Sequence, residues 1–137
     1  MGSRDLVLLL EEQWRLARRL RLLAERQREL VLEPDVQPFL RVLSERQNVV
    51  NAFSTLSERL APFREQWTTT YCGLDQPARR RVAELLEEVN STLGDILHDD
   101  LQESPNLKSE GRIGGAVNAI AHMEAGIRRA VPTSTHA

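Results

Sequence analysis

The most constraining feature of this sequence is a regular spacing of leucines over residues 3–32. Leucines, with a glutamine at two of the positions, recur at alternating intervals of three and four residues: Leu6, Leu9, Gln13, Leu16, Leu20, Leu23, Gln27 and Leu30. A second set repeats every seven residues beside the first, at Leu10, Ala17, Ala24 and Val31. These intervals place both sets on one face of an α-helix. The pattern therefore predicts one amphipathic helix about 40 Å long, since each residue adds about 1.5 Å.

A turn and a second helix are predicted to follow. Pro34 disfavours helix at the residue before it, and Asp35 suits the N-cap of a new helix. Pro38 then falls in the first turn, where its missing N–H costs nothing. We predict a helix from Val36 to about Ala61, whose core side would carry Val36, Phe39, Leu43, Val50, Phe53 and Leu60, flanked by Val42, Val49 and Leu56. Because the linker is so short, the two helices should form an antiparallel, coiled-coil-like hairpin.

The third helix is predicted after a break and a loop. Pro62 should kink or break the second helix, with a short continuation toward Trp67. Residues 68–73 are expected to form a helix end and a loop, with Gly73 at the C′ position. Asp75 can then cap a helix that has Pro77 in its first turn. Its core stripe would be Val82, Leu86, Val89, Leu93 and Ile96, with Leu85, Leu97 and Leu101 beside it, and it should end before residues 104–106.

The last segment, residues 111–131, is predicted to be a weaker helix. One face would carry Ile113, Val117, Ile120, Ala121 and Ile127. Three glycines, Gly114, Gly115 and Gly126, lie within it, and each costs up to about 1 kcal/mol relative to alanine. Residues 132–137 are predicted to be a disordered tail. The whole chain is thus expected to be all-α: an antiparallel three- to four-helix bundle with its core in residues 1–110, and a fourth helix that closes the bundle or docks loosely on it.

Charge and composition restrict the cellular setting. The net charge of −2 gives no general attraction to nucleic acid or to anionic membranes. The single cysteine, Cys72, allows no internal disulfide, which favours a reducing compartment. No apolar run approaches the roughly 20 residues of a membrane span, and the leucines near the N-terminus are followed at once by acids, unlike a signal peptide. We therefore expect a cytoplasmic location without membrane insertion.

Patterns that indicate catalysis are missing from the sequence. It has no phosphate-binding loop, no dinucleotide fingerprint and no His-Glu-x-x-His motif. A cysteine nucleophile needs an oriented base, and Cys72 is distant in sequence from all three histidines. We predict that the chain is not an enzyme and that it needs no metal or cofactor. Gln13 and Gln27 leave two alternatives open: they set register or partner choice, or they are satisfied glutamines at the edge of the core.

The first hairpin carries Asp35 in its turn, then Leu40 with Leu43, then the pair Arg46-Gln47. In this pattern it resembles flagellar export chaperones of the FlgN type. That family has a long helix rich in Leu, Glu and Arg, a brief turn containing Asp, and a second helix that opens with Leu-x-x-Leu and a basic–polar pair. The matching features here are the turn at Asp35, Leu40 with Leu43, and Arg46-Gln47, within a resemblance that covers residues 6–60. It implies a cytoplasmic chaperone of type III secretion that holds helical C-terminal segments of hook-associated subunits and delivers them for export. By position, it implies that the client-binding residues are Ile113, Val117, Ile120 and Ile127.

We therefore predict a protein-binding helical module with an apolar groove. The segment after residue 110 is amphipathic, diluted by glycine and preceded by a breakable linker, which suits a helix that detaches or binds a partner; the alternative is a poorly formed last bundle helix. The predicted partner-binding residues are Val89, Leu93, Ile96, Ile113, Val117, Ile120 and Ile127. Two further alternatives are a structural homo-oligomer, such as a homodimer in which the first two helices pack on a second copy, and, less favoured, a nucleic-acid-binding protein.

Overall fold

The fold is all-α, as the sequence predicts. The computed structural model describes residues 3–103 together with residues 123 and 126. Three long helices, α1 (Ser3–Leu30), α2 (Gln37–Glu65) and α4 (Gln76–Glu103), are joined by short turns and by one small helix, α3 (Trp67–Cys72). These described residues contain no β-strand, and none of their helices is both long and apolar enough to cross a membrane. The predicted helical bundle is confirmed.

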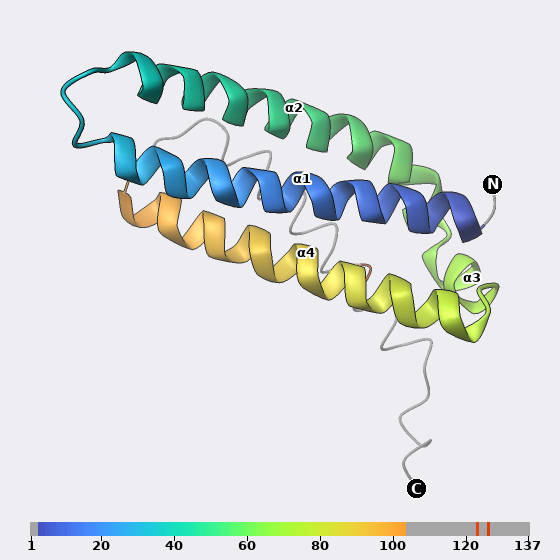
Figure 1. Ribbon diagram of the computed structural model, residues 1–137. Coiled ribbons are helices and arrows are strands. Elements are labelled where there is room, and N and C mark those ends of the chain that lie inside the picture. The colour runs from blue at the N-terminus through green and yellow to red at the C-terminus, as the bar shows by residue number, and fades with distance from the viewer. Residues whose placement is uncertain (1–2, 104–122, 124–125, 127–137) are drawn as a thin grey trace, which may run out of the picture.

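Helix α1 lies in the middle of the bundle (Figure 1). Helix α2 packs antiparallel along one side of α1, and α4 packs along the other side in the same direction as α1. Helix α3 lies at the end of the bundle near the N-terminus of α1, where it connects α2 to α4 (Figure 1). The central position of α1 requires it to bury two flanks at once, which explains why its apolar stripe is wider than a two-helix seam needs.

The burial along α1 differs in part from the predicted seam. Leu6, Leu10 and Leu20 are fully buried, and the supposed flanking residues Ala17 and Ala24 are buried as well. Leu9 and Leu16, in contrast, are only half-buried, although the heptad pattern puts them in the seam. The most buried line of α1 therefore points between α2 and α4, and the α2 side of its stripe stays partly open. Val31 does not extend the stripe, because it lies in the turn after α1 and is 61% exposed.

Helix α2 begins one residue later than predicted, so Asp35 lies one residue before the N-cap. Helix α2 begins at Gln37, and its N-cap is Val36, which offers no side-chain hydrogen bond. The carboxylate of Asp35 nevertheless accepts a hydrogen bond of 3.0 Å from the backbone N–H of Gln37. Pro38 lies in the first turn, as expected. Asp35 thus satisfies one of the free N–H groups at the start of α2, which is what a capping residue does.

The predicted end of α2 near Ala61 is wrong, whereas the predicted continuation past Pro62 is present. The helix continues through Pro62 to Glu65, and the break comes at Gln66, where φ is −122° and ψ is 44°. Proline removes only the hydrogen bond that residue 62 would donate to the carbonyl four residues earlier. Burial of Leu60 and Phe63 on both sides of the proline holds this last part of α2 against the bundle.

Residues 68–72 also differ from the predicted loop, because they belong to helix α3. Trp67 and Tyr71 are one turn apart and both buried, with ring centroids separated by 6.0 Å. Arg79 of α4 stabilises the end of α3: its Nε donates to the carbonyl of Tyr71 at 3.2 Å, and its Nη2 donates to the carbonyl of Cys72 at 2.7 Å. Gly73 ends α3 with φ of −79°, so the predicted left-handed C′ glycine is not formed.

Helix α4 matches its prediction closely. The carboxylate of Asp75 accepts a 2.9 Å hydrogen bond from the N–H of Ala78, the expected N-cap contact. The predicted core stripe, Val82, Leu86, Val89, Leu93 and Ile96, is buried throughout, as is Leu85. The predicted break at 104–106, most of the predicted helix 111–131 and the tail 132–137 lie outside the described residues; Met123 and Gly126 are the exceptions.

The two seam glutamines have different environments. Gln27 is half-buried, and its Oε1 accepts a 2.9 Å hydrogen bond from Arg46 of α2, so it is a satisfied glutamine at the edge of the core. Gln13 is 2% exposed, and its Oε1 has no hydrogen-bond partner among the described residues. A buried acceptor without a partner costs about 1–3 kcal/mol of stability. Gln13 is therefore a local weakness of the core.

Replacement of Gln13 should stabilise the protein. We expect Gln13→Leu to raise the free energy of unfolding by about 1–2 kcal/mol, because it removes the unpaired acceptor and adds apolar burial. Urea unfolding followed by circular dichroism measures this change. Gln47→Leu, at an exposed position of α2, is the matched control and should leave stability nearly unchanged. Equal effects of the two substitutions would contradict the assignment of Gln13 as an unsatisfied core residue.

Loss of the α4 cap should have the opposite effect. We expect Asp75→Ala to lower the free energy of unfolding by about 1 kcal/mol, because the N–H of Ala78 loses its acceptor. Asp75→Asn keeps a side-chain acceptor and should retain most of the stability. Thermal unfolding of the two variants beside the wild type tests the cap. A destabilisation of the same size in both variants would show that the carboxylate acts in some way other than capping.

Candidate functional site: a groove between α1 and α2

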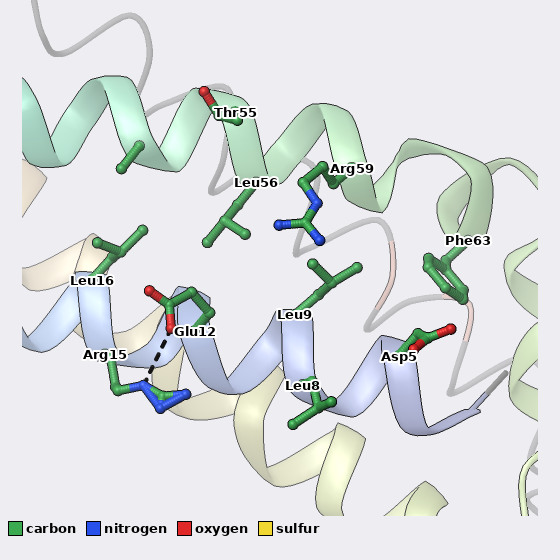
Figure 2. Close-up of a pocket in the computed structure, with 11 residues that line it drawn as sticks. Asp5, Leu8, Leu9, Glu12, Arg15, Leu16, Thr55, Leu56, Arg59 and Phe63 are labelled. Carbon is green, nitrogen blue, oxygen red and sulfur yellow. Dashed lines mark ion pairs between the residues drawn. The ribbon is translucent and has the colours of Figure 1, made fainter. Parts of the chain in front are cut away.

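A groove lies between α1 and α2, close to the N-terminus of α1 (Figure 2). It has a volume of about 1000 Å³ and is open to solvent. Helix α1 lines it with Asp5, Leu8, Leu9, Glu12, Arg15 and Leu16, and α2 lines it with Ala52, Thr55, Leu56, Arg59 and Phe63. Both walls therefore belong to the hairpin formed by the first two helices.

Side-chain size explains why the groove exists. Leu9 and Leu16 project from α1 toward α2 (Figure 2), and they remain half-buried. Across from them, α2 presents the small side chains Ala52 and Thr55, which leave space between the helices. Leu56 and Phe63 are almost fully buried and close the bottom of this space. The groove is thus an apolar trough that two small residues keep open.

Charged groups stand along the rim of the groove. Glu12 and Arg15 of α1 form an ion pair of 3.4 Å, and both side chains are at least half exposed. Arg59 reaches from α2 toward Leu9 (Figure 2), and no ion pair or hydrogen bond of its side chain is found within the described residues. Asp5 lies at the Phe63 end and is engaged in an interaction of its own. The groove therefore has an apolar floor, and its rim carries the Glu12–Arg15 pair and the cation of Arg59.

Three of the sequence-predicted partner-binding residues lie in the core and do not line the groove. Val89, Leu93 and Ile96 are between 0% and 2% exposed, so in this structure they form core and present no surface to a partner. Ile113, Val117, Ile120 and Ile127 lie outside the described residues. The groove residues were missed because the heptad pattern assigned Leu9 and Leu16 to the seam. The available signal was the small size of Ala52 and Thr55, but its meaning depends on how α1 and α2 align.

Two residues of the C-terminal segment contact α3. Met123 and Gly126 have helical backbone and are buried. The indole Nε1–H of Trp67 donates a 2.7 Å hydrogen bond to the carbonyl of Met123. A methyl group on Gly126 would lie 2.5 Å from Cδ1 of Trp67, closer than such atoms can approach. Gly126, which the sequence marks as a weakness of the helix, is therefore needed here for the close approach of backbone and indole.

The described residues contain no cluster of three or more His, Cys, Asp or Glu side chains suited to hold a metal ion. Cys72 is exposed.

Comparisons of the chain with protein families, with curated proteins and with solved structures gave no match. The groove geometry and the resemblance of the hairpin are therefore the grounds for the function proposed below.

The glycine contact yields a prediction in which two effects oppose each other. Gly126→Ala gains up to about 1 kcal/mol of helix propensity but forces a methyl group into Trp67, and such overpacking costs about 1–3 kcal/mol. We expect a net loss of stability, with a red shift of Trp67 fluorescence measured in a Trp14→Phe background. Gly94→Ala is the control, because no atom lies within 4 Å of the added methyl group, and it should stabilise the protein. Stabilisation by both substitutions would show that Gly126 does not approach Trp67 so closely.

Proposed function

We propose that this chain is a non-enzymatic protein-binding module that holds a helical segment of a partner in the α1–α2 groove. The observation that carries the proposal is the partial exposure of Leu9 and Leu16 in an open, apolar trough. Both residues belong to a heptad pattern whose other aliphatic members, such as Leu6 and Leu20, are buried. Burial of the two half-exposed leucines against a partner would supply binding free energy at about 25 cal/mol per Å² of apolar surface.

The groove has the dimensions of a short helix. Its α1 wall runs from Asp5 to Leu16, which at about 1.5 Å per residue is about 17 Å, or three helical turns. Leu9 and Leu16 are two turns apart, so a partner helix would place aliphatic residues at the same spacing. This is the helix-in-groove mode of recognition, in which side chains at i, i+3/i+4 and i+7 anchor the bound helix.

The finer proposal is that the module is an export chaperone whose client is a flagellar hook-associated subunit. Its support is the resemblance of residues 6–60 to the FlgN-type family, and all the residues that line the groove except Asp5 and Phe63 lie within that range. In this proposal the chain works in the cytoplasm and keeps a helical segment of the client soluble until export. The residues predicted from the resemblance, Ile113, Val117, Ile120 and Ile127, are proposed as a second contact region.

Filling the groove should weaken binding. The probe is a fluorescein-labelled amphipathic peptide of about 16 residues, with leucines at the i, i+4 and i+7 positions of each repeat. We expect Ala52→Trp to weaken its binding by at least about tenfold in fluorescence anisotropy, which corresponds to about 1.4 kcal/mol. Ser54→Trp is the matched control, because Ser54 is exposed on α2 and does not line the groove.

Two further measurements separate the alternatives. Light scattering of the chain alone shows whether a second copy takes the groove: a fixed dimer that Ala52→Trp dissociates would replace the partner proposal by self-association. Peptides that copy the C-terminal helices of hook-associated subunits test the finer proposal and should bind more tightly than the generic peptide. Failure of all peptides to bind the wild type would overturn the proposed function.

A further inference from the structure

We propose that the groove selects partner helices that carry a carboxylate, and that Arg59 is the residue that recognises it. This inference rests on the proposed function, because it concerns the same groove and specifies the chemistry of its occupant. The evidence is the position of Arg59, the charge balance of the groove and the spacing of Arg59 relative to the apolar floor.

Arg59 lies between two apolar residues of the groove floor. Its neighbours on α2 are Leu56, three residues before it, and Phe63, one turn after it, and both belong to the groove. Its side chain extends across the groove toward Leu9 of α1 (Figure 2). The guanidinium therefore lies above an apolar floor, where a bound helix would remove it from water.

The other charges of the groove are already engaged. Glu12 and Arg15 neutralise each other at 3.4 Å, and Asp5 has an interaction of its own. For the Arg59 side chain, the described residues provide neither an ion pair nor a hydrogen bond. Elsewhere on the hairpin, Arg19 is paired with Glu45 across the two helices at 3.1 Å. Among the described residues, Arg59 is thus an exposed cation whose donors make no ion pair or hydrogen bond.

An occupant without an acceptor would be penalised at this position. A helix in the groove would strip water from Arg59, and a desolvated charge must be compensated by a partner. A carboxylate is the best match, because the planar guanidinium can donate two parallel hydrogen bonds to it. An amide is a poorer acceptor, and a cation would be repelled. The chemistry of the groove therefore favours an acidic amphipathic helix.

The spacing gives the position of the acid along the partner. Arg59 stands at the level of Leu9, and Leu16 lies two turns further along α1. A partner helix packed along the groove would thus place its acidic side chain about two turns, or about 10 Å, from the aliphatic residue that contacts Leu16. The partner helix should therefore carry a stripe of aliphatic side chains, with a Glu or Asp next to one end of the stripe.

The test compares two peptides that differ at one position. Each is the labelled amphipathic peptide described above, with either Glu or Gln beside the end of the leucine stripe. We expect the wild-type protein to bind the Glu peptide about tenfold more tightly than the Gln peptide, because hydrogen bonds between charged groups are stronger than those to an amide. This ratio of affinities should fall as the salt concentration is raised. Arg59→Gln should bring the ratio close to one, and Arg59→Glu should make a Lys peptide the preferred ligand.

The control is Arg80→Gln, which removes an exposed arginine of α4 outside the groove and should keep the wild-type ratio. The outcomes distinguish the two proposals. If neither peptide binds, the groove is not a helix site and the proposed function fails. If both bind equally well to the wild type, the groove binds helices but Arg59 does not read a carboxylate, and only this inference is overturned.

Discussion

The structure depends on the simultaneous burial of α1 on two flanks. Leu6, Leu10 and Leu20 are fully buried because α2 packs on one side of α1 and α4 on the other. Removal of apolar surface from water is the main favourable contribution to folding, and here the central helix supplies surface to both interfaces. The short turn after α1 brings α2 back antiparallel to α1, and α3 then leads the chain into α4 on the other side of α1 (Figure 1).

The groove is a consequence of this arrangement. A helix whose most buried line points between two neighbours leaves the edges of its apolar stripe less covered, and Leu9 and Leu16 lie at the α2 edge. Larger residues on α2 could have covered them, but Ala52 and Thr55 are too small. The partial exposure of these leucines leaves apolar surface in contact with water, which is a cost to stability. The rim of the groove carries the ion pair of Glu12 with Arg15 and, from α2, the guanidinium of Arg59.

The end of the bundle is organised around an indole. Trp67 reaches its buried position because the chain breaks at Gln66 and starts a new helix. Its Nε1–H then needs an acceptor, which the carbonyl of Met123 provides, and its ring needs space, which the absence of a side chain at Gly126 provides. Arg79 completes this region by satisfying carbonyl groups at the end of α3. Hydrogen bonding and close packing, more than helix propensity, thus hold residues 123 and 126 in place.

The sequence by itself determined the helical class, the hairpin and the start of α4, because these depend on local rules: the heptad spacing of leucines, and side-chain caps such as Asp75. It also identified the core stripe of α4, since Val82 to Ile96 repeat on one face whatever they pack against. Only the tertiary structure decided which of these faces are surface. Val89, Leu93 and Ile96 became core, whereas Leu9 and Leu16 became the wall of a groove. The physical reason is that periodicity defines an apolar face, but the size and alignment of residues on the neighbouring helix decide whether that face is covered.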